Sequence, residues 1–354
     1  DLHYPLRRQR QMCIRDSTFT GPVVVTGDLT VTGASGTVST IQLNDNTLEC
    51  ADGTIRLTIP DNAQDSVIVL GGGSAAMIKS NKLELITSAD TSGSRVDVIG
   101  PSLEVTGNFD VNTNTGDATI EPQGLLVAGD LTVSSIGDGV ASLLMSANNL
   151  DVDGSLKITK TGGDLDAVES WPQFSSSGQS NVAGNVELKK VRFDADKVAF
   201  DGTDNQSVDF NGAGLADETI TVQNESGTVK LESDQSLLVK ILKVYSNTTF
   251  SDITSLVVTE TMQVIADNSK DVLLDAAGGS FTDVKLLEVK AGSGSGSATV
   301  SAIGPNISIE ELRVTSEGTN TGTPTLDIGD NLSLIHISEP TRPRLISYAV
   351  FCLK

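Results

Sequence analysis

The chain has 354 residues, a formal net charge of −22 and few aromatic side chains, 4% of the total. The negative charge disfavours nucleic acids and anionic membranes as partners, because phosphate groups are bound mainly by Lys and Arg. No run of residues approaches the roughly 20 apolar positions that span a bilayer, so membrane insertion is not expected.

The two ends of the chain look foreign to the rest. Residues 1–17 and 332–354 resemble translations of transposon-type sequencing adapters read in opposite directions. Such segments are set aside in reasoning about a fold, so we expect a biological core at 18–331 that is a fragment of a longer protein. The alternative is a basic N-terminal arm and an amphipathic C-terminal tail. Without the ends, Cys50 is the only cysteine and no histidine remains, which excludes a disulfide framework, a Cys-based zinc site and a histidine base.

A seven-residue phrase occurs four times: an apolar β-former, an Ala, Asp or Thr, a Gly followed by Asp, Asn or Ser, and an alternation of apolar and polar residues. The copies are 25–31, 105–111, 127–133 and 152–158. Alternation of period two predicts strands with one buried face. The Gly-Asx pair predicts a tight turn, with glycine free to adopt positive φ and Asx bonded to its own backbone. The phrase therefore predicts an elongated, all-β structure of repeated short strands.

Further strands follow in chain order. The same alternation marks the segments 41–59, 67–70, 83–86, 96–99, 103–105, 186–188, 191–193, 198–200 and 208–210. The glycine triplet at 71–73 is expected to be a plain turn, because no helix pattern follows it. Residues 237–244 fit a strand or a short helix equally well. A Ser-rich stretch predicts a linker at 171–184, between a first β region at 18–170 and a second at 185–331.

An internal duplication is also predicted. Residues 59–120 resemble residues 265–326, with a common offset of 206 at both ends and a shared Ile-Gly-Pro at 99–101 and 303–305. Repetition of one supersecondary unit is typical of stacked arrays.

Candidate sites are few. Asp-rich turns at 194–209 and 151–154 offer carboxylates for calcium, but they lack an EF-hand loop, so water-facing Asx turns are the favoured interpretation. Asn205, Asn224 and Asn247 begin glycosylation sequons, and Cys50 is expected to be a small core residue. No pair of carboxylates stands out for catalysis. We therefore predict no catalytic, cofactor-binding or metal-binding residue, no cofactor and no enzyme.

The phrase at 25–33, with the Ser/Thr/Gly stretch that follows it, resembles segments of phage tail-fibre shafts. The resemblance implies a virion structural protein outside the cell, with a β-solenoid-like or trimeric fibre shaft. It further implies a homotrimer that contacts other tail proteins and presents elements that bind a host-surface glycan or protein. The alternatives are a β-solenoid adhesin on a bacterial cell surface and a polysaccharide-degrading tailspike.

Overall fold

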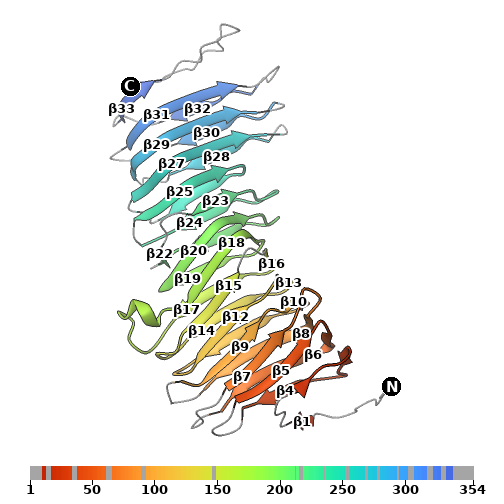
Figure 1. The fold of residues 1–354 in the computed structure, drawn as a ribbon. Coiled ribbons are helices and arrows are strands. Elements are labelled where there is room, and N and C mark those ends of the chain that lie inside the picture. The colour runs from red at the N-terminus through yellow and green to blue at the C-terminus, as the bar shows by residue number, and fades with distance from the viewer. Residues whose placement is uncertain are drawn as a thin grey trace. The chain divides into compact units, whose positions relative to one another are not determined.

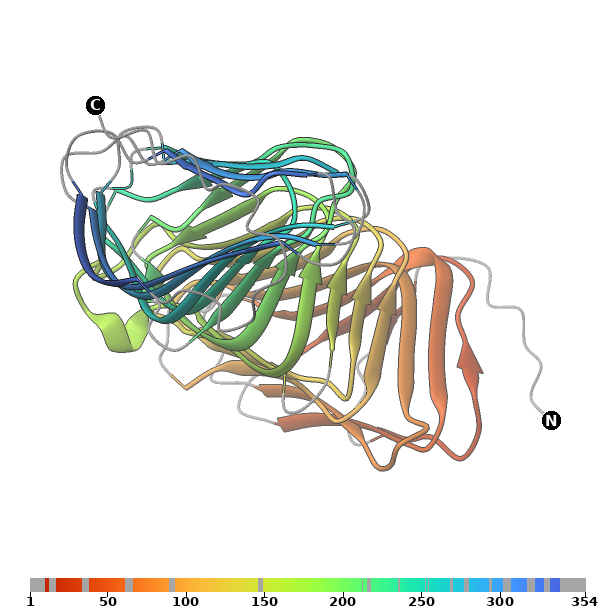
Figure 2. The same ribbon diagram turned by 90° about the horizontal axis from the view of Figure 1, so that it is seen from above.

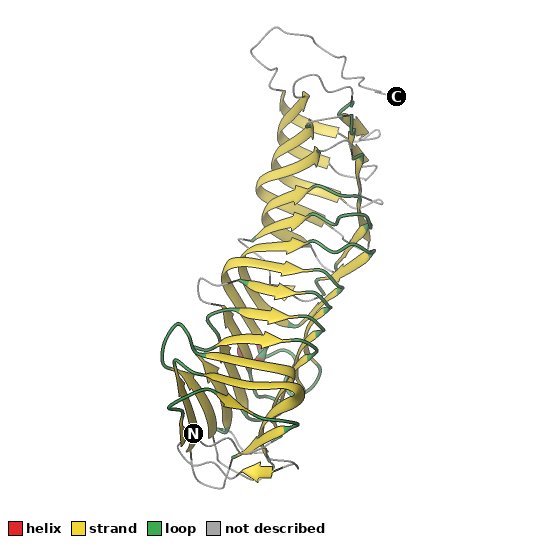
Figure 3. Cartoon of the chain, turned by 90° about the vertical axis from the view of Figure 1, so that its right-hand side faces the viewer, coloured by secondary structure: helices red, strands yellow, loops and turns green. Residues whose placement is uncertain are grey.

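We describe the protein from a computed structural model, shown in Figure 1. The structure describes residues 10–12, 17–33, 38–60, 66–88, 93–145, 149–211, 213–214, 218–234, 236–251, 253, 255–267, 270–276, 280–292, 295–301, 307–316, 322–327 and 332–337. Most of this part of the chain is strand, and the remainder is turns and loops with one short 3-10 turn (Figure 3). Most of the predicted linker is strand as well, and residues 237–244, which fit a strand or a short helix equally well, form a strand.

The chain divides into two compact units. Unit 1 comprises 1–181 with 188–194, and unit 2 comprises 182–187 with 195–354. Strands β18 (Gln173–Val182), β19 (Val186–Lys189) and β20 (Val191–Phe200) contribute residues to both units. One of the three points where the chain passes between the units, at 181/182, falls within the predicted linker at 171–184. That segment is nevertheless a strand, because Phe174 and Ser176 alternate with outward residues and are buried.

Unit 1 contains most of the shorter strands and the one helical turn described. These are β1 (Arg10–Met12), β2 (Ser17–Thr18), β3 (Val23–Val24), β4 (Leu29–Thr32), β5 (Val38–Asn44), β6 (Thr47–Ile59), β7 (Ser66–Gly71), β8 (Met77–Thr87), β9 (Arg95–Ile99), β10 (Ser102–Val105), β11 (Phe109–Thr113), β12 (Asp117–Glu121), β13 (Leu125–Val127), β14 (Leu131–Ser135), β15 (Ala141–Met145), β16 (Leu150–Val152), β17 (Leu156–Lys160) and the 3-10 turn η1 (Val168–Ser170).

Unit 2 continues with strands of the same kind. These are β21 (Gln206–Asp209), β22 (Ala213–Gly214), β23 (Thr219–Val222), β24 (Val229–Glu232), β25 (Leu237–Val244), β26 (Thr248–Ser251), β27 (Ser255–Ala266), β28 (Val272–Asp275), β29 (Ser280–Ala291), β30 (Ala298–Ser301), β31 (Ile307–Ser316), β32 (Thr325–Asp327) and β33 (Leu332–Ile337). The adapter-like ends contribute to the described structure only β1, part of β2 and β33.

Each unit is a parallel β-solenoid. In unit 1, β9, β10 and β11 form one coil, and they pair in parallel with β12, β13 and β14 of the next coil. The step from Phe109 to its partner Leu131 is 131 − 109 = 22 residues, which is one coil. In unit 2, β28 and β29 pair with β30 and β31 in the same way (Figure 2). The predicted all-β, repetitive short-strand fold is confirmed, and it is of the β-solenoid type.

The repeated phrase forms the core of unit 1. The apolar residue that directly follows the Gly-Asp, Gly-Asn or Gly-Ser pair of the phrase stacks in register from coil to coil and forms one column. Every member of this column is 0–7% exposed: Leu29, Ile55, Leu83, Phe109, Leu131 and Leu156. Burying each such side chain stabilises the fold by roughly 1.5–3 kcal/mol. Two members of this column, at Ile55 and Leu83, lie in coils whose sequences the phrase does not match clearly.

In three of the four copies, at Gly107, Gly129 and Gly154, the glycine of the phrase is required by close packing between coils. A Cβ at Gly154 would lie 2.3 Å from the carbonyl oxygen of Gly129, and one at Gly129 would lie 2.6 Å from that of Gly107. Real Cβ atoms do not approach backbone atoms so closely. Among the four copies only Gly27 has a positive φ, 92°. The predicted reason, freedom to adopt positive φ, is therefore wrong for the other three copies.

The Asx residue of the phrase bonds the next coil. The side-chain oxygen of Asp28 accepts the backbone N–H of Thr54 at 2.9 Å, that of Asn108 accepts Asp130 N–H at 3.1 Å, and that of Asp130 accepts Ser155 N–H at 2.8 Å. We call this contact the Asx staple. The expected bond to the residue's own turn is replaced, because stacking places the N–H of the next coil above each side chain.

The two predicted duplicated segments have the same order of strands. After Ile59 the chain forms β7, β8, β9, β10, β11 and β12. After Ile265 it forms β28, β29, β30, β31 and β32, with the long strand β31 in the place of β10 and β11. Several residues that carry the resemblance, including those at 61–65 and 302–306, lie outside the described residues.

Candidate functional site

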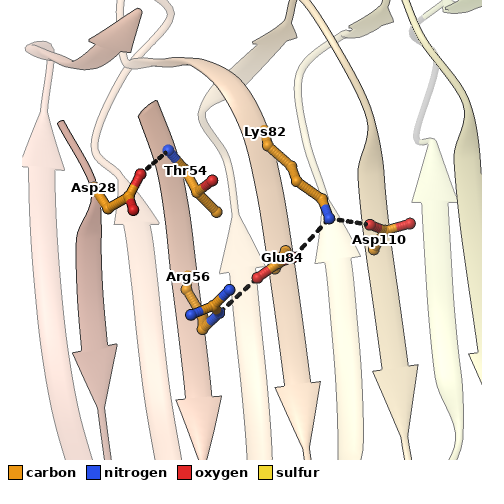
Figure 4. A network of polar contacts seen from close by, with 6 residues as sticks. All are labelled: Asp28, Thr54, Arg56, Lys82, Glu84 and Asp110. Atoms are coloured by element: carbon orange, nitrogen blue, oxygen red, sulfur yellow. Dashed lines mark hydrogen bonds and ion pairs between the residues drawn. The ribbon is translucent and has the colours of Figure 1, made fainter. Parts of the chain in front are cut away.

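A ladder of paired charges runs across neighbouring coils on the outer face of unit 1 (Figure 4). Arg56 on β6 contacts Glu84 on β8 at 2.5 Å, and Lys82 contacts both Glu84 at 2.7 Å and Asp110 on β11 at 3.0 Å. These side chains point outward because they alternate with the buried column. The ladder therefore holds three successive coils together from the outside.

The ladder also shifts its own protonation equilibria. Burial alone would raise the pKa of Glu84, but hydrogen bonds from Lys82 and Arg56 outweigh it and leave this pKa below its ordinary value. Hydrogen bonds to Glu84 and Asp110 raise the pKa of Lys82. A similar pair between Lys79 and Glu104, 2.7 Å apart, joins β8 to β10 and raises the pKa of Lys79. Each of these three pKa shifts favours the charged form of its group, Glu84, Lys82 or Lys79.

Asp97 is the most unusual acid of unit 1. It lies on β9 with 3% of its surface exposed, and Arg95 contacts one of its carboxylate oxygens at 3.0 Å. The other oxygen, Oδ1, has no hydrogen-bond partner. Burial raises the pKa of Asp97, and Arg95 and Thr119 oppose that rise. One unpaired carboxylate oxygen does not make a cation site. Asp97 is therefore best described as a buried acid whose unpaired oxygen lowers the stability of the fold.

The predicted Asp-rich turns are found only in part: Asp194 and Asp196 lie within strand β20, so the prediction of turns at these two residues is wrong. The Asp209 carboxylate accepts both the backbone N–H and the side-chain amide of Asn211, at 3.0 and 3.1 Å. This is an Asx turn of the expected kind. Burial, followed by the charge of Asp153, raises the pKa of Asp151. Within the described ranges, three or more His, Cys, Asp or Glu side chains do not gather as a metal site would need.

The three sequon asparagines are structural. Asn205 and Asn247 are Asx staples of unit 2, and accept the backbone N–H groups of Thr228 and Leu273 at 2.9 and 3.0 Å. Asn224 is buried, and its amide donates to the side-chain oxygen of Gln206 at 2.8 Å. Each of these side chains thus has a hydrogen-bonding role within the fold.

Cys50 is buried, as expected, and its thiol donates to the carbonyl oxygen of Gly27 at 2.7 Å. Burial raises the pKa of Cys50, and the charge of Asp28 adds to the rise. A thiol held protonated is a poor nucleophile, so this side chain fits a packing role.

Sequence reasoning missed a long loop between β17 and β18. Residues 161–172 carry Trp171, the only tryptophan of the chain, and the turn η1. Beneath the loop lies Lys160, which is 3% exposed and donates to the carbonyl oxygens of Gly137 and Ser170 at 2.7 and 3.2 Å. Burial lowers the pKa of Lys160, although Asp138 and Asp164 oppose this. The lone tryptophan at 171 was the available signal, but it was interpreted as part of a linker.

Comparisons with known proteins give no relative. No protein-family model matches the chain, and neither a curated protein nor a solved structure resembles it at a significant level. In the part of the chain that the structure describes, a helix long and apolar enough to cross a membrane is not found. The fold and its surfaces are therefore the basis for a proposal of function.

Proposed function

We propose that the chain is a structural module of a phage tail fibre, a stack of β-coils that sets a distance and presents host-binding elements. The observation that carries this is the regular coil-to-coil bonding: the Asx staples and the outward ion pairs tie each coil to the next. Each coil added to such a stack lengthens it by about 4.8 Å, the spacing between hydrogen-bonded strands. A stack of this kind suits a spacer, whose length is its working property.

The fold also defines how copies would associate. The strands of each coil pair within one chain, for example β11 with β8 and β14. A homotrimer, if formed, would join through side-chain faces, since strand exchange is not needed to complete the coils. The full chain's mass in solution, measured by light scattering after size exclusion, tests this: a trimer supports the fibre shaft, and a monomer removes the trimer from the proposal.

A second candidate is a β-solenoid adhesin on a bacterial surface. The same self-contained pairing favours it, because a single-chain solenoid needs no partner to present a binding surface. Antibodies raised against the full chain and tagged with gold would separate the two, using virions and cells from the source of the sequence. Label on virion appendages supports the fibre, whereas label on the cell envelope contradicts it and supports the adhesin.

The spacer property has its own test. We would insert three further copies of 109–130, one coil each, directly after Asp130, so that each copy restores a Gly-Asx corner and the register of Phe109 with Leu131. The chain should fold and lengthen by about 14 Å in small-angle X-ray scattering. Inserting three copies of 109–119, half a coil each, is the control and should disrupt the stack. An in-register insertion that leaves the length unchanged would contradict a spacer.

A further inference from the structure

We propose that the 161–172 loop is a binding site for a protein partner that offers an apolar pocket rimmed by Lys or Arg. Figures 1 and 2 both show η1 standing away from the strands of unit 1. The inference does not require the virion assignment, because it concerns which surface binds and not where the protein works.

Apolar side chains gather at this corner. Among the described residues, seven large apolar side chains are classed as exposed, and three of them are here: Ile136, Leu165 and Val168, at 54, 41 and 49%. The coils bring Ile136 next to the loop, because Thr161 N–H donates to the carbonyl oxygen of Ser135 and Gly162 packs against the backbone of Ile136. Exposed apolar clusters on a soluble protein mark contact surfaces.

Several contacts within unit 1 hold the loop in place. Asp164 N–H donates to the Asp138 carboxylate at 2.8 Å, which is the Asx staple again. The Trp171 indole N–H donates to the carbonyl oxygen of Leu165 at 3.1 Å, and Lys190 Nζ lies 5.1 Å from the centre of the indole ring. The Lys160 ammonium fastens the far end of the loop at Ser170. A surface held in one conformation loses little entropy on binding, which is a property of good binding sites.

The charge of the loop selects the partner. Asp164, Asp166 and Glu169 are exposed beside Leu165 and Val168. Carboxylates around an apolar centre are complementary to a pocket with a basic rim, and they speed its approach. The same charges repel anionic lipid and a second copy of this chain, whose net charge is −22.

A peptide-display library, selected against the immobilised full chain, tests the proposal. The proposal expects enriched peptides that combine Lys or Arg with aliphatic or aromatic residues, and these peptides should change the fluorescence of Trp171. The double variant Leu165→Ser/Val168→Ser should weaken their binding at least tenfold. The matched control is Leu126→Ser/Leu273→Ser, which removes two apolar side chains of similar exposure, 42 and 41%, from other surfaces.

A third variant tests the charge. Asp166→Asn/Glu169→Gln should weaken binding several-fold at low salt and much less at high salt. Enriched peptides without basic residues, binding that survives Leu165→Ser/Val168→Ser, or no enrichment over that variant would each overturn the proposal. So would self-association of the full chain that the same double variant abolishes, because the occupant would then be a second copy. Circular dichroism confirms that each variant is folded before it is scored.

Discussion

Unit 1 and unit 2 join their coils by the same device but encode it differently. In unit 1 the Asx staple belongs to a recognisable phrase, as at Gly129-Asp130. In unit 2 the staple is Asn185, Asn205, Asn247 or Asp271, and the residue before it is Gly, Asp, Ser or Lys. The geometry needs only a short side chain with an oxygen acceptor under the N–H of the next coil. The glycine is needed only where coils approach most closely, so the phrase fades while the bonding persists.

The cores differ as well. Unit 1 stacks mostly aliphatic side chains and contains one aromatic pair, Phe174 and Phe193, whose rings are stacked 4.9 Å apart. Unit 2 contains two such pairs, with the rings of Phe200 and Phe210 6.3 Å apart and those of Phe250 and Phe281 5.9 Å apart. Strands β25 and β29 pair across register shifts, as strands β5 and β6 of unit 1 also do. A solenoid thus tolerates irregular coils if local packing compensates.

The largest expected effect is on these cores. Phe250→Ala in unit 2 and Phe109→Ala in unit 1 should each cost about 3–5 kcal/mol, because both rings are fully buried. Stability in a solenoid is carried by neighbouring coils, so Trp171 fluorescence in urea should report the Phe109 change more strongly. Circular dichroism should detect both. Equal shifts of the fluorescence transition would show that the units unfold together and would end the comparison.

Corner glycines should matter next. Gly129→Ala places a Cβ against the backbone of Gly107 and should cost about 1–3 kcal/mol in urea unfolding. Gly124 is the control, since nothing lies within 4 Å of its added Cβ. Gly124→Ala should be neutral or stabilise by up to about 1 kcal/mol. If Gly129→Ala leaves stability unchanged, the coils can separate slightly to admit the Cβ. Close packing would then not be the reason for glycine at this position.

The staples should have equal value in both units. Asp130→Ala and Asn247→Ala should each cost about 1–2 kcal/mol in thermal or urea unfolding, because each leaves a backbone N–H without its acceptor. Asp130→Asn keeps the acceptor oxygen and should change stability by less than about 0.5 kcal/mol. If only one of the two substitutions lowered the free energy of unfolding, the Asx staple would not stabilise both units in the same way.

Surface ion pairs should matter least. Glu84→Gln should cost less than about 1 kcal/mol at neutral pH, and salt should reduce the cost. The pKa of Glu84 is lowered in the folded state, so its contribution is present above the ordinary Glu pKa and is lost as pH falls through the lowered value. The Glu311→Gln control breaks an exposed pair with Arg313 on the same strand and should have a smaller effect. A difference between Glu84→Gln and wild type that persists at low pH would contradict this account.

The sequence by itself determined the class of fold and much of the core. Period-two alternation marked the strands, and the repeated phrase located the column through Phe109 and Leu131. Alternation works because side chains of a strand point to opposite faces whatever the strand pairs with. It also identified residues 41–59, which became most of β5 and β6.

Only the tertiary structure decided what the turns and surfaces do. The donor that bonds an Asx side-chain oxygen lies in the next coil, 22 residues away at Asn108, and no local pattern specifies that distance. The 171–184 segment looked like a linker because it is rich in Ser, yet small side chains fit inside a narrow coil at Ser176 and Ser180. The 161–172 loop became a candidate site only when stacking placed Ile136 beside it. Contacts between coils are set by register, and register arises from the whole stack of strands.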